Sequence, residues 1–426
     1  MSERIIRAAA CLAFLVVAEV AKSSEGDQRY QTVIDQAVAA GVPGLQAHVR
    51  EGEASWSGVA GLVSVEQRRA MARGDRIRLA SLTKMMTAAV TLEFVRRGRF
   101  KLSDRIVTLL PAVVLDGVPY AEEITVGDLL EHRSGLHNFN GEDGADFGRD
   151  LFWDPERGQR LWTAAELLAY AKRPEHRPTN RPGEKQSYSS TGYIVLEMLL
   201  EDRSGQSLHR LLRDYLFAPL KMETAALEGG DATGAEIADS YARPSTGDRL
   251  APSPFSGRKA SRDDGLVNLS AGLGHYNAWA RGAGAVAASV GDLAKFMDAV
   301  VAGRFEVMTD QAAQFARLRE KPGKFFDWNG GSRGIQTTIL YEPNRNITVI
   351  VLTNASNAGT SSHEVAKQLL DAVRGARDLG GHACSVLATA FCDRELSPPA
   401  MPKEIVEHTK VRRGRTPLPN RSFRLP

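Results

Sequence analysis

Four short segments of the chain have the alternating or continuous apolar pattern of β-strands. Two lie near the start, at 45–50 and 55–61, with Gly and Glu residues between them. Two lie near the end, at 335–341 and 347–353, and a Glu-Pro-Asn-Arg turn separates them. Such runs, bounded by turn residues, are typical of strands. The sequence therefore predicts strands at both ends of the chain.

Helical periodicity dominates the chain between these strand pairs. The strongest pattern lies at 82–97, where apolar residues cover nearly every side, so we expect this helix to be buried. Other helical patterns run through 124–220 and 290–302, and those at 30–40 and 363–374 flank the strands. Strands at both ends with helices inserted between them predict an α+β fold that carries a helical subdomain.

Length and composition are those of an ordinary globular protein. The 426 residues, 43% of them apolar and 25% charged, exclude a wholly disordered, collagen-like or polytopic membrane chain. A segment rich in Gly, Pro, Ser and Asp at 228–265 predicts a long loop of the kind that often rims a site. We place the main domain at 24–378 and its helical subdomain within about 82–310.

The first 23 residues have the order of a secretory signal peptide. Arg4 and Arg7 precede an apolar run at 8–18, and small or polar residues follow. This run is too short to span a bilayer, which takes about 20 residues. We therefore expect cleavage of residues 1–23, export to the periplasm or the exterior, and no stable membrane insertion afterwards.

The C-terminal segment, 379–426, differs from the rest of the chain. Residues 397–426 hold seven Lys or Arg against two Glu and are rich in proline, so they predict a disordered basic tail. Because 24–396 carries a slight net negative charge, the body has no basic field, and we expect no nucleic-acid partner. Cys384 and Cys392 suggest a disulfide in an exported protein. A helix across 385–391 would exclude that bond, since it would separate the cysteines by about 12 Å.

A candidate nucleophile lies at the start of the predicted buried helix. Ser81 and Lys84 form a Ser-x-x-Lys motif, whose first and last residues share one face of a helix. A Lys in apolar surroundings loses its proton more easily and can then activate the hydroxyl. The alternative is structural, with Ser81 as a helix cap and Lys84 in solvent. A second Ser-x-x-Lys, at 256–259, lies in the predicted loop, where no helix brings its ends together.

A competing motif, Gly-Gly-Ser-Arg-Gly at 330–334, matches the nucleophile elbow of α/β-hydrolases. That elbow needs a helix after the serine, but the residues that follow have the pattern of a strand. No βαβ series surrounds the motif, so we disfavour it.

Several motifs together resemble the serine β-lactamase and penicillin-binding-protein superfamily, in its class C β-lactamase-like branch. The resemblance runs over roughly 30–374. The motifs occur in the family's order: Ile-Arg-Leu-Ala-Ser-Leu-Thr-Lys at 77–84, Ile-Thr-Val-Gly-Asp-Leu-Leu-Glu-His-Arg-Ser-Gly-Leu at 124–136, Arg-Pro-Gly at 181–183, Tyr-Ser-Ser-Thr-Gly-Tyr at 188–193, Ala-Pro-Leu-Lys-Met at 218–222, Gly-Ala-Gly at 282–284, Asp-Leu-Ala-Lys-Phe at 292–296 and Val-Leu-Thr-Asn at 351–354. The resemblance implies an antiparallel sheet flanked by the N- and C-terminal helices, with the helical subdomain inserted.

Two departures from the family pattern bear on the substrate. The family's Tyr-x-Asn reads Tyr188-Ser189-Ser190 here, and its Lys- or His-x-Gly strand motif reads Trp328-Asn329-Gly330. The family uses that cation to hold a substrate carboxylate. The indole of Trp328 at this position removes the charge and presents an apolar surface instead. The Trp-x-Gly form is similar to that of family VIII carboxylesterases. Arg333 could still supply a partner for a carboxylate.

The resemblance implies a mechanism. Ser81 is the nucleophile, Lys84 and Tyr188 share its proton, and the backbone N–H groups of Ser81 and Gly331 stabilise the oxyanion. We expect a small-molecule acyl substrate, no cofactor and no metal. His132, His137 and His275 are not expected to be bases.

Three functions remain open at this point. The leading interpretation is an exported serine hydrolase of the carboxylesterase type that cleaves esters or amides. The second is a penicillin-sensitive D-Ala peptidase or weak β-lactamase. The third is a non-catalytic cell-wall or ligand-binding homologue, which the changes at Ser190 and Trp328 motivate.

Overall fold

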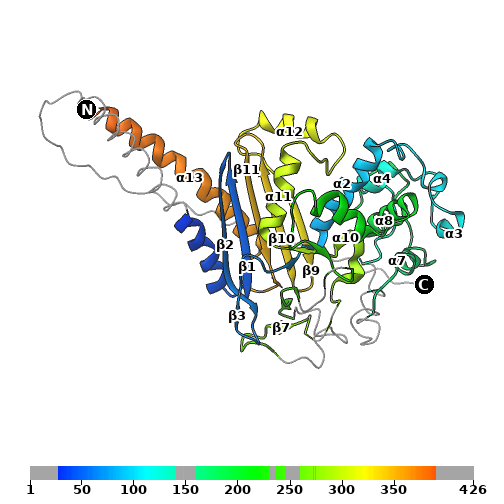
Figure 1. The fold of residues 1–426 in the computed structure, drawn as a ribbon, viewed down its shortest axis with the longest axis horizontal. Coiled ribbons are helices and arrows are strands. Elements are labelled where there is room, and N and C mark those ends of the chain that lie inside the picture. The colour runs from blue at the N-terminus through cyan, green and yellow to red at the C-terminus, as the bar shows by residue number, and fades with distance from the viewer. Residues whose placement is uncertain are drawn as a thin grey trace, which may run out of the picture. The chain divides into compact units, whose positions relative to one another are not determined.

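A six-stranded antiparallel sheet forms the centre of the fold, as a computed structural model of the chain reveals (Figure 1). The structure describes residues 27–140, 147, 160–230, 232, 236–244, 260–271, 273 and 275–389, with side chains as far as 375. The sheet runs in the order β3 (Arg69–Ala70), β2 (Ala54–Ser64), β1 (Gly44–Glu51), β11 (Ile347–Thr353), β10 (Ile335–Glu342) and β9 (Phe326–Ser332). Strands from the two ends of the chain therefore meet in one sheet, as the sequence predicted.

The helices at the two ends of the chain cover one face of this sheet. Residues 27–39 are helical, and α13 (Ser362–Thr389) closes the described chain. On this face Val349 and Val351 of β11 pack in one apolar cluster with Ile34 of the first helix and Leu369 of α13. The predicted flanking helices are confirmed.

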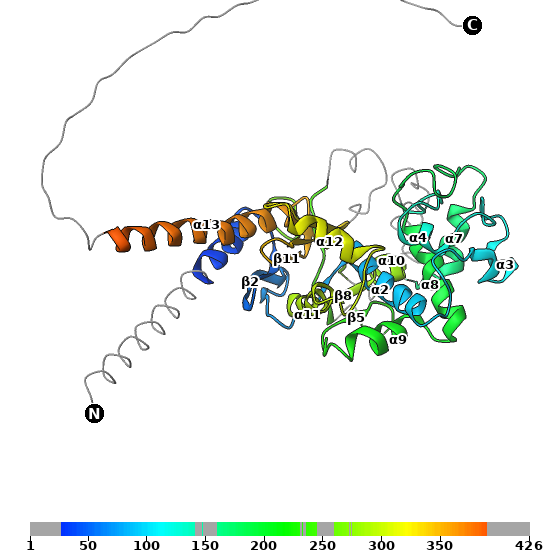
Figure 2. The same cartoon turned by 90° about the horizontal axis from the view of Figure 1, so that it is seen from above.

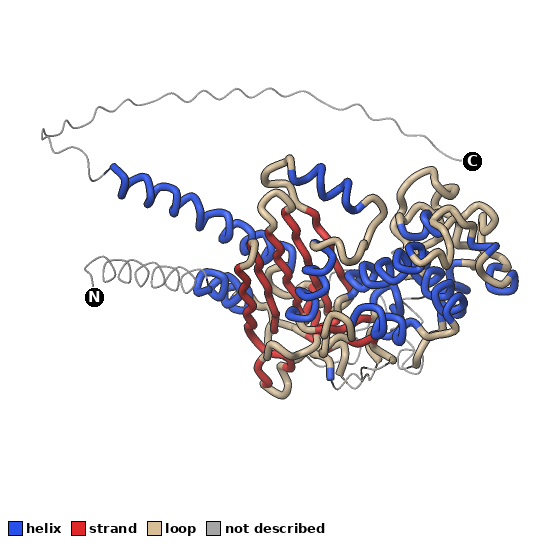
Figure 3. Tube along the Cα trace, turned by 45° about the horizontal axis from the view of Figure 1, so that its top comes forward, coloured by secondary structure: helices blue, strands red, loops and turns tan. Residues whose placement is uncertain are grey.

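The alternate residues of the same strand face the helical subdomain. Ile350 and Leu352 belong to the larger apolar cluster, which also contains Leu293 of α11 (Val290–Val301) and Met86 of α2 (Thr83–Arg96). Period-two alternation along β11 thus places an apolar layer on each face of the sheet. The layers are visible in Figure 3, where helices lie on both sides of the strands.

The helical subdomain is built from short helices around α2. Figure 2 shows α3, α4, α7 and α8 gathered on the side away from β2. Its members are α2, α3 (Ala112–Leu115), α4 (Val126–Leu130), α7 (Ala164–Ala171), α8 (Ser190–Ser204), α9 (Leu208–Leu212) and α10 (Arg281–Gly284). Nearly the whole surface of α2 is buried, as its apolar pattern predicted.

Two small sheets position the segments around the predicted nucleophile. One has the order β4 (Ile77–Arg78), β8 (Val286–Ala288) and β5 (Ala226–Leu227). In it the buried Arg78 guanidinium donates two hydrogen bonds, of 2.8 and 2.9 Å, to the Glu228 carboxylate. The other has the order β12 (Ala355–Ser356), β6 (Tyr241–Ala242) and β7 (Val267–Asn268), so a strand interrupts the loop predicted at 228–265.

Several predictions for the two ends of the chain lie outside the described residues. These are the signal peptide at 1–23, the basic tail and Cys392. The helix predicted at 363–374 is longer than expected and passes through Cys384, while the Cys384–Cys392 disulfide remains a prediction. Within the described chain, no helix is long and apolar enough to cross a membrane, and no group of acidic, His or Cys residues could hold a metal ion.

Candidate active site

Ser81 lies in a tight turn at the start of the buried helix. It is the middle residue of the 3-10 turn η1 (Ala80–Leu82), and α2 begins at Thr83. Ala80, directly before it, has a φ of +47°, a strained conformation for a residue with a Cβ and one that often occurs at functional sites. The Ser81 side chain caps neither helix. The structural alternative for Ser81, a helix cap, is therefore wrong.

Lys84 is buried one turn further along and points back to Ser81. Its side-chain amine donates hydrogen bonds to Ser81 Oγ (3.2 Å), Ser190 Oγ (3.3 Å) and the carbonyl of Ala283 (2.7 Å). Only 6% of the residue is exposed, and burial lowers the pKa of the amine. The alternative of a solvated lysine is therefore wrong as well.

Tyr188 reaches the same hydroxyl from a distant part of the chain. Its phenol oxygen lies 2.6 Å from Ser81 Oγ, and the Lys84 nitrogen lies 4.9 Å from the centre of its ring. Burial alone would raise the pKa of the phenol, but the charge of Lys84 and hydrogen bonds from Lys84, Ser81 and Ser190 lower it. Although 52% of Tyr188 is exposed, its hydroxyl is held within the group of Ser81 and Lys84. Such a trio can move the serine proton as a coupled unit.

Ser190 begins α8 and occupies the position where the family has an amide. Its hydroxyl accepts from Lys84, and its backbone N–H donates to Asn138 Oδ1 at 2.9 Å. No sequence pattern selects Asn138, because its contact with α8 joins residues 52 positions apart. Asn138 holds the first residue of α8, and with it the Ser190 hydroxyl, beside Lys84.

His132 packs directly on the Tyr188 ring, with 4.5 Å between ring centres. Its Nδ1 accepts a hydrogen bond from the backbone N–H of Ser189 at 3.2 Å. Burial, and then the nearby Lys84 charge, lower the pKa of the imidazole to about 4, so the ring is neutral at pH 7. Among the described interactions, the contact of His132 with the trio is the one with the Tyr188 ring. It therefore supports the phenol and is not placed as a base.

The other two histidines do not contact this group through any described interaction. His137 stacks on His176, with ring centres 4.1 Å apart. His275 lies ahead of the 3-10 helix Ala278–Ala280, and its carbonyl accepts from the Ala278 N–H.

The edge strand β9 lies against η1. A Cβ placed on Gly330 would come within 2.4 Å of the Leu79 carbonyl and 3.2 Å of the Leu82 nitrogen, so only glycine allows this approach. A Cβ on Gly331 would meet no atom within 4 Å, which leaves open space beside that residue. This contact brings the backbone of Gly331 close to the turn that carries Ser81.

Trp328 and Arg333 lie at different places on the same hairpin. Trp328, on β9, is partly buried and stacks on Phe326 at 5.2 Å between ring centres. Arg333 is exposed in the turn between β9 and β10, and its carbonyl accepts from the Tyr276 hydroxyl at 3.0 Å. No described contact joins either side chain to Ser81.

The same hairpin rules out the nucleophile elbow. Ser332 ends β9, and β10 begins at Ile335 after a turn in which Gly334 has a φ of +74°. A strand, not a helix, follows the serine, as the apolar pattern predicted.

Comparison with known proteins identifies the family. Residues 30–374 match the Beta-lactamase family. The chain belongs to the Beta-lactamase family. This match covers the sheet, the helical subdomain and every candidate site residue, so the resemblance read from the motifs is confirmed.

Curated relatives are similar over parts of the chain. Penicillin-binding protein 4 from Amycolatopsis lactamdurans is 30% identical over 161 residues, which are 38% of this chain and 38% of that protein. A D-aminopeptidase from Brucella canis is 28% identical over 190 residues, 44% of this chain and 33% of the relative. The chain thus matches about a third of the length of these curated relatives.

Solved structures share the fold over most of this family member. D-amino acid amidase from Ochrobactrum anthropi SV3 has a TM-score of 0.66 at 21% identity and covers 82% of this chain and 99% of its own. EstCE1, a hydrolase with promiscuous acyltransferase activity, has a TM-score of 0.62 at 19% identity, with the same coverage. These likenesses establish the β-lactamase/transpeptidase-like fold, and family membership supports a serine hydrolase.

Proposed function

We propose that this Beta-lactamase family protein is a serine hydrolase of the carboxylesterase type. The observation that carries the proposal is the contact of three groups: the Tyr188 phenol and the buried Lys84 amine lie 2.6 and 3.2 Å from Ser81 Oγ. Its substrate is a small-molecule acyl ester. Export of the mature chain, expected from residues 1–23, is part of the same proposal.

The reaction proceeds through an acyl-enzyme. Ser81 Oγ attacks the ester carbonyl carbon while its proton passes to the Lys84–Tyr188 pair, which returns it to the leaving alkoxide. Water then attacks the acyl carbon, gives a proton to the pair and releases the carboxylic acid, and the pair reprotonates Ser81. Positioned proton transfer of this kind contributes about 10²–10⁴ in rate.

The backbone N–H groups of Ser81 and Gly331 bind the oxyanion in this proposal. Support comes from the close approach of β9 to η1 at Gly330 and from the open space beside Gly331. A donor of this kind is worth about 10²–10³ in rate.

Trp328 favours uncharged esters over substrates with a carboxylate. Its indole takes the strand position where the family has a cation, and it packs on Phe326 against the apolar core. A neutral ring offers a carboxylate no charge, whereas it offers an apolar acyl or alcohol group a contact surface.

A peptidase or amidase is the second candidate. The names of the relatives, a D-aminopeptidase and a D-amino acid amidase, favour it. In this case the exposed Arg333 would supply the partner for a carboxylate. A penicillin-sensitive enzyme of this type would acylate Ser81 with a β-lactam, and a non-catalytic homologue would react with nothing.

Intact-mass analysis separates these functions. The purified mature chain and a Ser81→Ala control are exposed to p-nitrophenyl butyrate, a fluorescent penicillin and a fluorophosphonate. We expect turnover of the ester and one fluorophosphonate adduct, both lost in Ser81→Ala. Penicillin labelling of Ser81 without ester turnover would favour the peptidase. Full activity in Ser81→Ala would refute the assignment of the nucleophile, and failure of every reagent would favour the non-catalytic homologue.

A further inference from the structure

A row of buried polar side chains joins α2 and α8 behind the nucleophile. On α2, Lys84 and Thr87 are three residues apart and share a face. On α8, Ser190, Tyr193 and Glu197 follow a helical spacing on one face. Ser190 accepts from Lys84, and the Lys84 nitrogen lies 5.6 Å from the centre of the Tyr193 ring. Glu197 continues this row away from the reacting groups.

The short helix α10 lies beside this row and contacts side chains of both α2 and α8. The Ala283 carbonyl accepts from the Lys84 amine at 2.7 Å, which is the shortest hydrogen bond of that amine. The neighbouring Gly282 carbonyl accepts from Thr87 Oγ1 at 2.7 Å. The position of the Lys84 nitrogen therefore depends on where the backbone of α10 lies.

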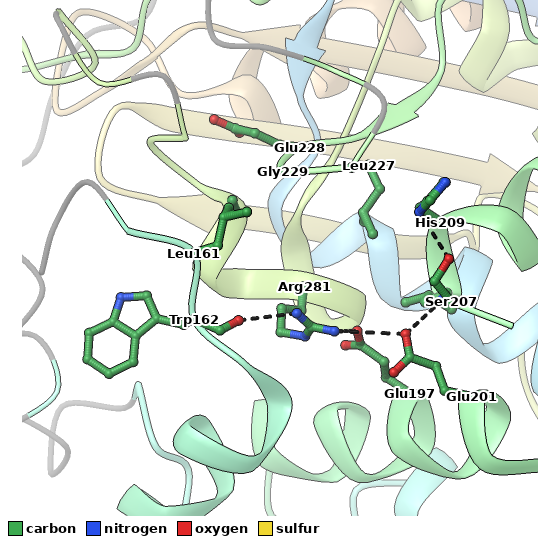
Figure 4. A pocket seen from close by; sticks show the side chains of 13 residues that line it. Leu161, Trp162, Glu197, Glu201, Ser207, His209, Leu227, Glu228, Gly229 and Arg281 are labelled. Carbon is green, nitrogen blue, oxygen red and sulfur yellow. Dashed lines mark hydrogen bonds and ion pairs between the residues drawn. The ribbon is translucent and has the colours of Figure 1, made fainter. Parts of the chain in front are cut away.

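Glu197 holds that backbone from the other side. Its carboxylate is fully buried, accepts from the Gly282 N–H at 3.0 Å and forms an ion pair with Arg281. Figure 4 shows Arg281 between Glu197 and the Trp162 carbonyl, which accepts from its guanidinium at 3.1 Å. These contacts border a pocket of about 190 Å³, beside which Glu201 lies 3.9 Å from Arg281.

The backbone of α10 needs this support because its first residue is strained. Arg281 has a φ of +43°, which costs about 1–3 kcal/mol for a residue with a side chain. A Cβ on Gly282 would lie 2.8 Å from a Leu208 methyl group and 3.2 Å from Glu197 Oε2, so the carboxylate sits tightly against the turn. A strained conformation persists only where its surroundings fix it.

We propose that Glu197 is a positioning residue for Lys84, acting through the backbone of α10. It fixes the Gly282–Ala283 peptide so that the Ala283 carbonyl holds the Lys84 amine in line with Ser81 Oγ. This inference rests on the proposed function, because it concerns the group that takes the serine proton.

Removal of the carboxylate has a defined effect on Lys84. The Ala283 carbonyl, as an acceptor, stabilises the ammonium form of Lys84 more than the free amine. If the loss of Glu197 lets this carbonyl move away, the pKa of Lys84 falls. The titratable or charged groups that face Lys84 or Glu197 are Tyr188, Tyr193, His132, Arg281 and Glu201. All of these groups remain in a Glu197 variant, so a shift in the pH profile reports the loss of Glu197 itself.

The test compares Glu197→Ala with Glu197→Gln and Thr87→Val in the full mature chain. In Glu197→Ala we expect kcat/KM for p-nitrophenyl butyrate to fall about tenfold to hundredfold and its acidic limb to move to lower pH. Glu197→Gln keeps an acceptor for the Gly282 N–H, so its changes should be smaller. Thr87→Val removes the other hydrogen bond to the same turn and should shift the limb in the same direction.

Circular dichroism and thermal unfolding establish that each variant is folded. A folded Glu197→Ala with an unchanged acidic limb and unchanged kcat would overturn the proposal. If Glu197→Ala does not fold, the test rests on Glu197→Gln and Thr87→Val. An unchanged acidic limb of the kcat/KM profile in both of these variants would overturn the proposal. The wild-type reaction with fluorophosphonate is measured first. Failure there refutes the proposed function, whereas a labelled wild type with unshifted variants refutes only the role of Glu197.

Discussion

The Tyr188 phenol lies 2.6 Å from Ser81 Oγ, although the two residues are 107 positions apart in the chain. Ser81 belongs to the turn before α2, and Tyr188 belongs to the segment that enters α8. The packing of α2 against α8 therefore brings the phenol to the hydroxyl. Neither helix alone could create this contact.

Tyr188→Phe should lower the acylation rate of Ser81 by about 10²–10⁴, the usual worth of a positioned proton-transfer group. The ring remains against His132, so the fold is preserved. Stopped-flow acylation by a p-nitrophenyl ester measures the rate, and thermal unfolding serves as the control. An acylation rate within a factor of two of wild type would exclude the phenol from the proton transfer.

The pH profile should reflect two lowered pKa values. Burial lowers the pKa of Lys84, and at Tyr188 the Lys84 charge and the hydrogen bonds outweigh the opposite effect of burial. At low pH both groups carry their protons and no base is available. As the pH rises, the pair loses a proton below the ordinary value of about 10 for either group. We therefore expect kcat/KM to rise with pH and to level off below pH 10.

A profile that rises only around pH 10 would contradict this expectation. His132 adds no step near neutrality, because its pKa is about 4. A His132→Asn variant should therefore keep the neutral part of the profile, and that invariance is the control.

His132→Asn should lower the acylation rate about twofold to tenfold. Asparagine keeps an acceptor for the Ser189 N–H and tolerates the φ of +57° at this position, so the local backbone is retained. It removes the ring that packs on Tyr188, a contact worth about 0.5–1.5 kcal/mol. Single-turnover kinetics measure the effect. A rate equal to that of wild type would show that the phenol needs no support from this ring.

Gly330→Ala and Gly331→Ala form a matched pair on β9. A Cβ at Gly330 would come within 2.4 Å of the Leu79 carbonyl, so either β9 or the turn before Ser81 must move. We expect Gly330→Ala to destabilise the protein by about 1–3 kcal/mol and to lower acylation. A Cβ at Gly331 would meet no atom within 4 Å. The free energy of unfolding of Gly331→Ala should therefore lie within about 0.5 kcal/mol of the wild-type value. Equal stabilities in urea unfolding would contradict the close contact of β9 with η1.

Much of the sheet could be predicted because its strands have a regular apolar pattern. The segment at 347–353 matches β11 at both ends, and β10 extends one residue beyond its prediction. The apolar pattern does not predict strand β9, because Phe326–Ser332 contains Asp, Asn and two Gly residues, and only the family's strand motif at 328–330 indicated it. This segment is a strand because it pairs with β10, and the local apolar pattern of a segment does not predict such pairing.

Residue spacing predicts the site only where its geometry is local, whereas Tyr188 was predicted through the resemblance to the family. Ser81 and Lys84 are joined by helical spacing, so the sequence alone brought them together. Asn138 and Glu197 act through contacts with segments 52 and 85 positions away, which no spacing rule reveals. The sequence suggests His132 only as a candidate base, whereas the stacking of its ring on Tyr188 is a contact that no spacing rule reveals.

The sheet also determines when during synthesis the site can form. Leu45 of β1 pairs with Thr353 of β11, and among the described strands β9 pairs with β10 alone. The ribosome must therefore translate β11, near the end of the domain, before β10 and then β9, the edge strand beside Ser81, can pair into the sheet. Until then the nascent chain contains Ser81, Lys84 and Tyr188, but strand β9, which completes the site, is not yet paired. A chain stalled before residue 347 should consequently remain inert toward acyl reagents.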